Sequence, residues 1–415
     1  MNQAKRYKVL ISAYACEPGK GSEPEVGWQW VVHLAEYCDV TVLTRSNNRQ
    51  AIDDKLSKIA GNKPHFIYID LGTLSRNVKQ WIKPRFAAVS WYYSSWQTKA
   101  FFEIKELQKR NHYDLIHHLT FASFRLPFAV SGHGAPCVVG PVGGCEEFPE
   151  ELLPIRGRKV VAKEVFRNLM TRLITGLGLG MHRYHCVDQV IASTLEMQQV
   201  FAEHNIESHL VSQIGVTGDN TAAMVKQKKA NDGRIKLLFV GGIVYWKGLE
   251  LAVHVLSDLP PTVSLTIIGS GPDEGLLRKE VERLMLTDRV HFMGRKKHNE
   301  VIKLYENYDL FLYPSLHDSG SFTVLEAMAA GLPVVCLDRG GPALSVDNEC
   351  GKVIKAKSRH ETINSLRSAV KYYLNNPAQL AVHGDCARRK LLDAYDWEKK
   401  AQTMATIYDD VITGR

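Results

Sequence analysis

The chain has 415 residues, of which 45% are hydrophobic and 23% charged, and its formal net charge at pH 7 is +8. This length predicts two domains, and a composition without low-complexity tracts excludes a disordered chain. The longest aromatic and apolar run, residues 86–96, is too short to cross a bilayer. Residues 1–12 hold too brief an apolar run for a secretion signal, so we expect a cytoplasmic protein. The eight cysteines form no C-x-x-C pair and have no histidine at metal-ligand spacing, which predicts reduced thiols and no metal site.

The first predicted strand, residues 7–12, leads through a glycine loop into a helix. The G-x-G in this loop resembles a dinucleotide-binding fingerprint, but Pro24 occupies the third glycine position. The next strand, residues 40–43, ends in Thr-Arg and not in an acid that could hold a ribose. We therefore exclude a nicotinamide or flavin site and expect Gly21 and Ser22 to lie in a loop on the acceptor side of a cleft.

Two segments mix basic with apolar or aromatic residues. Residues 76–110 contain eight Lys or Arg against two acids, interleaved with aromatic side chains, and residues 156–183 form a second basic amphipathic stretch. This pattern favours peripheral contact with the cytoplasmic face of the inner membrane, or with a lipid-linked substrate. The alternative is that both segments are amphipathic helices packed on their own domain. No motif typical of nucleic-acid binding is present, so we expect no nucleic-acid partner.

The strand predicted at residues 114–118 ends in two adjacent histidines, His117 and His118. Neighbouring residues on a strand point to opposite faces, so at most one imidazole faces the cleft. The alternative for each of these two histidines is a structural place in the core of the domain. Strands at residues 188–193 and 209–214 complete a first α/β half.

The polar segment 217–233 lacks periodicity and predicts an interdomain linker. The α/β pattern then restarts with strands at residues 235–240 and 263–268. Two successive halves predict two Rossmann-like, doubly wound domains that face each other across a cleft. The N-terminal domain is predicted to span residues 1–216 and the C-terminal domain residues 234–396.

Residues 310–342 predict a strand, a Gly/Ser loop, a helix at 323–330 and a second strand. The loop and the helix N-terminus, at the C-terminal end of a parallel strand, offer unpaired N–H groups and a positive dipole end that suit a phosphate. Asp318 and Glu326 frame this turn with seven residues between them, although a lone Glu in a first helical turn also serves the helix dipole. A phosphate turn flanked by acids that can bind hydroxyl groups predicts a sugar nucleotide.

The second half, with GGIVYWKG, IIGSGP, VHFMG, LYENYDLFLYPS and the D-x7-E of HDSGSFTVLEAMAAGLPVVC, resembles the retaining GT-B glycosyltransferases of the GT4 family. The first half, with SAYACEPGKGSEPEVGW, DLIHHLTFASFRLP and GPVGG, is similar to a subgroup involved in bacterial surface-polysaccharide assembly. The resemblance implies a metal-independent hexosyltransferase that moves a sugar from a nucleoside-diphosphate sugar to a glycan or lipid-linked acceptor. It implies no cofactor beyond this co-substrate. It also implies that the helix at 397–415 packs back on the N-terminal domain.

The resemblance assigns roles to individual residues. Lys247 would neutralise the leaving diphosphate, Glu326 would bind the ribose hydroxyls, and Asp318, one methylene shorter than the family's glutamate, would contact the donor sugar. Gly242 replaces a family arginine, a charge that Arg295 or Arg339 would have to supply. The residues assigned to catalysis are Lys247, Asp318, His117 and His118. Those assigned to donor binding are Glu326, Gly242, Gly294, Arg295, Ser319, Gly320, Ser321, Phe322 and Thr323.

Three alternatives remain open on the sequence. The family pattern D-x-x-H-x-H appears as DLIHHL, so His117 matches the first histidine, His118 is the nearest substitute for the second, and the sequence leaves open which of them faces the cleft. A sugar-nucleotide 2-epimerase would share the architecture. The glycine at position 242 and the shortened acid Asp318 also fit a degenerate, non-catalytic sugar-nucleotide-binding subunit.

Overall fold

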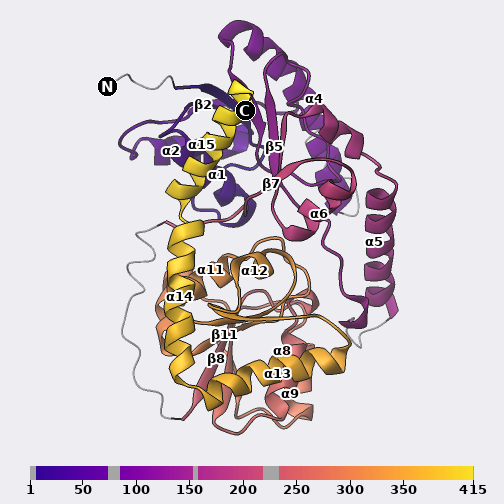
Figure 1. The fold of residues 1–415 in the computed structure, drawn as a ribbon, viewed down its shortest axis with the longest axis vertical. Helices are drawn as coiled ribbons and strands as arrows, with labels where there is room; N and C mark the ends of the chain where they lie inside the picture. Colours follow the sequence, from indigo (N-terminus) through magenta and orange to yellow (C-terminus); the bar gives the residue numbers. More distant parts are fainter. Residues whose placement is uncertain (1–5, 73–84, 153–157, 218–232, 415) are drawn as a thin grey trace. The chain divides into compact units, whose positions relative to one another are not determined.

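The computed structural model describes residues 6–72, 85–152, 158–217 and 233–414. The chain forms two compact units, each built on a parallel sheet with helices packed around it (Figure 1). The first unit comprises Met1–Cys145, Ile174–Gln213 and Trp397–Arg415. The second comprises Glu146–Leu173 and Ile214–Asp396. The predicted fold class, α/β of the GT-B type with two Rossmann-like domains, is confirmed.

The sheet of the first unit has the order β3-β2-β1-β4-β5-β6-β7 within the described residues, and all its pairings are parallel. Its strands are β1 (Lys8–Ser12), β2 (Asp39–Thr44), β3 (His65–Tyr68), β4 (Leu115–His118), β5 (Cys137–Val142), β6 (Gln189–Ala192) and β7 (Ser208–Leu210). Val9, Leu10 and Ile11 on β1 are fully buried because helices cover both faces of the sheet. The strand order reverses between β1 and β4, so the loops that follow these two strands lie at the switch point of the sheet.

The helices of the first unit include the described part of the first segment singled out by its composition, residues 85–110, whereas the second segment contributes only its part after residue 173. They are α1 (Ser22–Leu34), α2 (Arg49–Leu56), α4 (Arg85–Asn111), α6 (Leu195–Glu203), α15 (Trp397–Thr413), the C-terminal end of α5 (Arg158–Gly176), and the short 3-10 helices η1 (Ser46–Asn48) and η3 (Met181–Cys186). The terminal helix α15 packs on α1, where the rings of Trp30 and Trp397 meet edge to face with centroids 5.3 Å apart. The side chain of Tyr7 also donates a hydrogen bond to Asp409 at 2.7 Å.

The sheet of the second unit has the order β10-β9-β8-β11-β12-β13 within the described residues, again entirely parallel. Its strands are β8 (Ile235–Val240), β9 (Val263–Ile268), β10 (Val290–Phe292), β11 (Leu310–Tyr313), β12 (Val334–Leu337) and β13 (Gly351–Ile354). Its helices are α8 (Leu249–Ser257), α9 (Glu274–Arg283), α10 (His298–Leu304), α11 (Phe322–Ala329), α12 (Gly340–Ser345), α13 (Arg359–Asn375) and α14 (Ala378–Ala394), with the 3-10 helices η2 (Glu150–Leu152), η4 (Tyr245–Lys247) and η5 (Tyr305–Asn307).

Residues 146–173 belong to the second unit, although their place in the sequence assigned them to the N-terminal domain. The side chain of Asn168 on α5 makes two hydrogen bonds to the backbone of Phe148, at 3.0 and 2.7 Å. The ring of Phe148 in turn lies 6.0 Å from that of Tyr245, which follows β8. The N-terminal part of α5 is therefore fixed to the β8 loop of the second unit. The predicted linker, residues 217–233, lies almost entirely outside the described residues.

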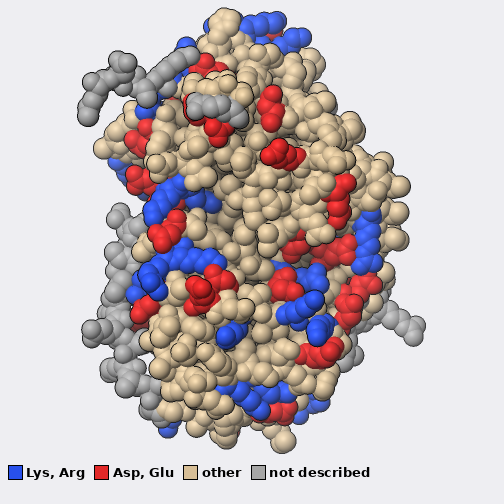
Figure 2. Space-filling view, in the orientation of Figure 1, with Lys and Arg blue, Asp and Glu red and all other residues tan. Residues whose placement is uncertain are grey.

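The described part of the basic aromatic segment contributes aromatic side chains both to the core of the first unit and to its surface. Residues 73–84 lie outside the described part of the chain, and α4 buries Tyr92, Tyr93 and Trp96, while Phe102 remains 62% exposed. None of the helices in the described ranges has the length and apolar character needed to span a bilayer. On the face drawn in Figure 2, Lys and Arg are interspersed with Asp and Glu and do not form one broad basic patch.

Candidate active site

The loops that follow β8 and β11 bring Lys247, Tyr313 and Asp318 into one hydrogen-bonded cluster. The Lys247 ammonium donates to the Tyr313 hydroxyl at 2.6 Å and to the Asp318 carboxylate at 2.5 Å, and the Tyr313 hydroxyl donates to the same carboxylate oxygen at 2.7 Å. The side chains of Lys247 and Asp318 are 19% and 14% exposed. An ammonium has three protons to donate, and the third has no acceptor among the described residues. The cluster thus joins the two residues that the sequence assigned to catalysis in this unit.

The charge state of this cluster follows from its burial. Burial lowers the pKa of Lys247, but the neighbouring Tyr313 and Asp318 outweigh it, so the pKa lies above its ordinary value. Burial and the Asp318 carboxylate raise the pKa of Tyr313 to about 12. At neutral pH the lysine is therefore charged and the tyrosine protonated.

A glycine in the left-handed region allows the turn that carries Lys247 to lie against the end of β11. Gly248 has φ +68°, and a Cβ at this position would lie 1.9 Å from the carbonyl oxygen of Pro314. The amide of Leu316 also donates a hydrogen bond to the carbonyl of Trp246 at 2.8 Å. This close backbone contact holds the lysine turn and the Asp318 loop together.

The loop from Asp318 to Ser321 leads directly into α11. The amides of Phe322 and Thr323 precede the first intrahelical hydrogen bonds of α11, which run to the carbonyl of Ser321. On its other side the loop touches the start of α12: the amide of Gly341 donates to the carbonyl of Asp318 at 2.9 Å. Ser319, Gly320, Ser321, Phe322 and Thr323 therefore form one continuous stretch beside the lysine cluster, at a positive helix end.

Glu326 lies one turn inside α11, and both of its carboxylate oxygens have partners. Oε1 pairs with Nε2 of His298 at 2.9 Å, and Oε2 accepts a hydrogen bond from the Tyr305 hydroxyl at 2.9 Å. The hydrogen bond to Glu326 raises the pKa of His298. The Tyr305 ring lies 6.0 Å from that of Phe311, which stacks on Tyr313 at 5.7 Å. This row of aromatic rings connects Glu326 to the lysine cluster.

The loops after β8, β9 and β10 also lie at the C-terminal ends of the strands of this sheet. The amide of Gly269 donates to the carbonyl of Gly294 at 3.0 Å, and a Cβ on Gly269 would lie 1.9 Å from the carbonyl oxygen of Gly241. Gly242 is exposed, and a Cβ there would lie 4.0 Å from the Val244 side chain. Arg295 is exposed. The structure thus places the predicted donor-binding residues on loops at the C-terminal ends of the strands of the second unit and, for Phe322, Thr323 and Glu326, in the first turns of α11.

The two histidines of β4 are core residues of the first unit. His117 is fully buried, with Nδ1 2.6 Å from the Tyr408 hydroxyl of α15 and Nε2 2.8 Å from the carbonyl oxygen of Gly140. Nε2 of His118 lies 3.2 Å from the Tyr93 hydroxyl. Burial lowers the pKa of His117 to about 4 and that of His118 to about 3. Both nitrogens of His117 have hydrogen-bond partners and both rings are buried in the core of the first unit, and a catalytic role for either histidine stays a prediction.

Gly21 and Ser22 lie where the sequence placed them, after β1 and at the start of α1. Both are exposed, and both have positive φ, at +72° and +54°. The neighbouring Glu23 accepts a hydrogen bond from the amide of Phe121 at 2.8 Å, which joins this loop to the one that follows β4. The loop remains a candidate for binding an acceptor.

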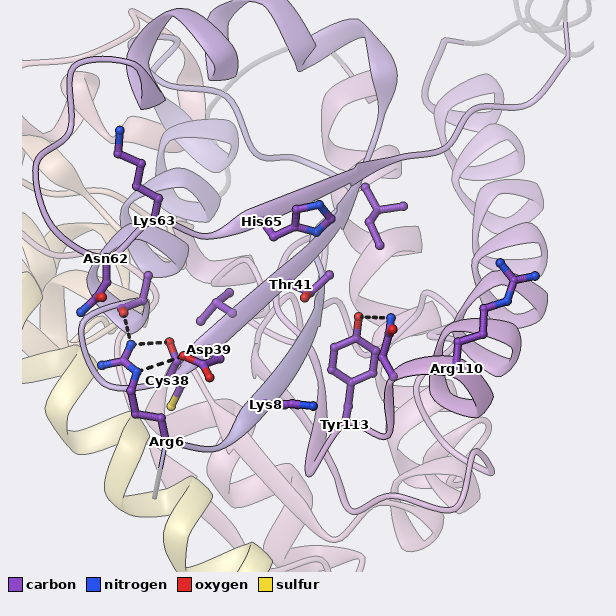
Figure 3. Close-up of a pocket in the computed structure, with 14 residues that line it drawn as sticks. Arg6, Lys8, Cys38, Asp39, Thr41, Asn62, Lys63, His65, Arg110 and Tyr113 are labelled. Carbon is purple, nitrogen blue, oxygen red and sulfur yellow. Dashed lines mark hydrogen bonds and ion pairs between the residues drawn. The ribbon is translucent and has the colours of Figure 1, made fainter. Parts of the chain in front are cut away.

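A cavity of about 550 Å³ lies at the N-terminal ends of β1, β2 and β3, opposite the loops that follow these strands (Figure 3). It contains none of the predicted site residues. Arg6 donates to Asp39 at 3.0 Å and to the carbonyl oxygens of Ala35, Glu36 and Cys38 at 2.6 to 2.9 Å. In a parallel sheet the C-termini of the connecting helices lie at the N-terminal ends of the strands. Cations at this position therefore have a structural role, because they bind the carbonyl groups of the helix ends.

Sequence reasoning missed several residues of the site. Tyr313 is the last residue of an apolar strand, and its hydroxyl at the C-terminal end of that strand was an available signal. His298 begins the helix after the Gly294 loop, a position that also predicts a place at the C-terminal ends of the strands. Tyr305 gave no local signal, because its role depends on its hydrogen bond to Glu326, 21 residues further along the chain.

Comparison with known proteins gives a family match within the second unit. Residues 220–388, less than half of the chain, match the family described as "Glycosyl transferases group 1". The glycogen synthase of Mycobacterium tuberculosis (strain ATCC 25618 / H37Rv) is 29% identical over 184 residues, which is 44% of each chain. The lipopolysaccharide core biosynthesis mannosyltransferase LpcC of Rhizobium leguminosarum bv. viciae is 26% identical over 241 residues, or 54% of this chain and 65% of that protein. The chain thus spans less than half the length of the first of these relatives.

Solved structures match over nearly the whole chain. Sucrose-phosphate synthase from Thermosynechococcus elongatus superposes with a TM-score of 0.64 at 18% identity, covering 99% of this chain and 100% of that one. HepE from Anabaena, solved in complex with UDP, superposes with a TM-score of 0.58 at 14% identity, covering 97% and 100%. At these identities the likeness establishes the fold. Together with the match of residues 220–388, it supports a glycosyltransferase.

Proposed function

We propose that the protein is a retaining, metal-independent glycosyltransferase that moves a sugar from a nucleoside-diphosphate sugar to a glycan or lipid-linked acceptor. The observation that carries this proposal is the Lys247–Tyr313–Asp318 cluster beside the N-terminus of α11. Breaking the anomeric C–O bond leaves a diphosphate, whose growing negative charge needs fixed positive groups. The Lys247 ammonium and the amides of Phe322 and Thr323 provide them in one place.

The remaining donor contacts follow from the same arrangement. Glu326, held by His298 and Tyr305, offers carboxylate oxygens for the ribose hydroxyls. Asp318 would contact the hydroxyl groups of the donor sugar bonded to this diphosphate. The backbone at Gly294 and Arg295, on the neighbouring loop, would meet the nucleobase. In a retaining reaction of this kind the acceptor attacks from the face that the diphosphate leaves, and the diphosphate takes the acceptor's proton. Asp318 and Glu326 then serve in binding and not as a nucleophile and its acid.

The acceptor is proposed to be lipid-linked or part of a cell-surface glycan, with transfer at a membrane. Helix α5 exposes a row of apolar side chains beside its basic residues: Val165, Phe166, Leu169 and Leu173 are 40 to 62% exposed. An apolar face bordered by cations suits the interface of a membrane with anionic lipids. The similarity to a lipopolysaccharide mannosyltransferase supports the same class of acceptor.

The test is a screen of purified protein against UDP-, GDP- and ADP-sugars, first by thermal shift and then by release of nucleoside diphosphate with and without candidate acceptors. UDP-sugars come first, because the HepE structure was solved with UDP. We expect one base to stabilise the protein and its sugar to be transferred with retention of anomeric configuration. Conversion of the donor to its 2-epimer would assign the epimerase reaction instead. Failure of every donor to bind would reject the proposal. Sedimentation with anionic liposomes at low salt tests the membrane contact separately.

A further inference from the structure

Helix α5 brings two charged side chains to the loop that carries Lys247. The side chain of Glu164 is 3% exposed, and its carboxylate accepts a hydrogen bond from the hydroxyl of Tyr245. The same carboxylate lies 3.1 Å from Nε of Arg167, one turn further along the helix. Tyr245 begins η4, the turn that ends at Lys247. The helix is thus connected directly to the lysine turn.

Arg167 has hydrogen-bonding capacity that the fold leaves unused. One terminal guanidinium nitrogen is buried and has no hydrogen-bond partner among the described residues. The side chain as a whole is 28% exposed, so the fold does not enclose it completely. A guanidinium presents five N–H donors in a planar fork, which matches the geometry of phosphate oxygens.

The charge of Arg167 acts on the loop that binds the predicted anion. His317 immediately precedes Asp318, and burial first, then Arg167, lowers the pKa of His317 to about 4. Lys247 adds a smaller effect of the same sign. Both cations therefore lie within electrostatic range of one imidazole, which is neutral at physiological pH.

One cation is insufficient for the chemistry proposed above. Lys247 supplies a single positive charge, whereas a departing nucleoside diphosphate carries more than one negative charge. We propose that Arg167 binds the diphosphate of the donor as the second cation of the site, with Glu164 positioning it. This inference rests on the proposed function and adds to it a residue from α5. Arg339, which also has a buried nitrogen without a hydrogen-bond partner in the described structure, is the competing source of this charge.

The experiment compares binding of UDP, GDP and ADP, and of their uncharged nucleosides, by isothermal titration calorimetry. The variants are Arg167→Gln, Arg167→Lys and Arg339→Gln. Arg172→Gln is the matched control, because Arg172 lies on the same helix, is 55% exposed and pairs with Glu147 at 2.7 Å. We expect Arg167→Gln to weaken binding of the preferred diphosphate about tenfold, which corresponds to one charge-assisted hydrogen bond, and to leave nucleoside binding unchanged. Arg167→Lys should lose less affinity for the diphosphate than Arg167→Gln, and the control Arg172→Gln should lose none.

Three results would overturn the inference. The first is normal diphosphate affinity in Arg167→Gln when the wild-type protein binds diphosphate. The second is an equal loss of nucleoside and diphosphate affinity, which would mean a structural role for the arginine. The third is a loss confined to Arg339→Gln. A wild-type protein that binds none of the three diphosphates would instead reject the proposed function, so the two failures are distinguishable.

Discussion

Replacing Lys247 with alanine removes the ammonium that faces the predicted leaving group, and its surroundings set the size of the expected loss. A unit charge that develops about 4 Å from an ammonium interacts with it by about 4 kcal/mol at an effective dielectric constant of about 20. Solvent screening reduces this figure, because the side chain is 19% exposed. Removing one preorganised donor from a developing anion typically costs about 3 kcal/mol. We therefore expect kcat to fall by at least about 100-fold.

The measurement is the rate of sugar transfer at saturating donor and acceptor. Saturation separates the effect on the chemical step from weaker donor binding. Lys303→Ala is the control, because Lys303 on α10 is exposed to solvent. Circular dichroism and the thermal midpoint establish that the variant is folded. A kcat within a few-fold of the wild-type value would refute the assignment of Lys247 to the leaving group.

Three further perturbations test the site and its scaffold. Asp318→Asn removes the carboxylate that holds Lys247 at 2.5 Å, so calorimetry should show tighter binding of nucleoside diphosphate while sugar transfer slows; weaker binding would contradict the competition between carboxylate and phosphate. Gly248→Ala places a Cβ 1.9 Å from a backbone carbonyl oxygen at φ +68° and should lower the free energy of unfolding in urea by more than about 2 kcal/mol. Gly275→Ala, with no atom within 4 Å, is its control, and equal stabilities of the two variants would contradict the steric argument. Burial lowers the pKa of His117 from 6.5 to about 4, so between these pH values the unfolded chain binds more protons than the folded chain. The free energy of unfolding therefore falls as the pH is lowered through this range, by up to about 1.4 kcal/mol per pH unit. His117→Asn should reduce this slope in urea denaturation; an unchanged slope would show that the imidazole does not titrate as proposed.

The strands of the second unit could be predicted almost to the residue. The bounds expected for the strands at 235–240, 263–268 and 310–313 are those of β8, β9 and β11. These strands are largely buried on both faces of a parallel sheet, so each is predominantly apolar, with Lys236, Ser264 and Thr266 as exceptions, and ends at glycine or a polar loop. The loops after them carry the predicted donor-binding residues because the C-terminal ends of parallel strands share one edge.

Features that depend on distant contacts could not be predicted. Glu164 and Tyr245 are separated by 81 residues, and nothing in the pattern of α5 indicates that its buried face meets the second sheet. His117 and Tyr408 are separated by 291 residues. A histidine at the end of a strand has the same local sequence whether it faces substrate or a tyrosine of the terminal helix, and only the packing of α15 decides between them.

The charged groups of the site are compensated before any ligand binds. Lys247 pairs with Asp318, Arg167 with Glu164, and His298 with Glu326. An anion must therefore compete with a carboxylate that is already in place, which limits the affinity for a diphosphate alone. A donor sugar changes this balance, because its hydroxyl groups can satisfy Asp318 and release the ammonium of Lys247 to the phosphate. Under the proposed function, such an exchange would favour the intact sugar nucleotide over its diphosphate product, and Asp318 would then contribute to product release.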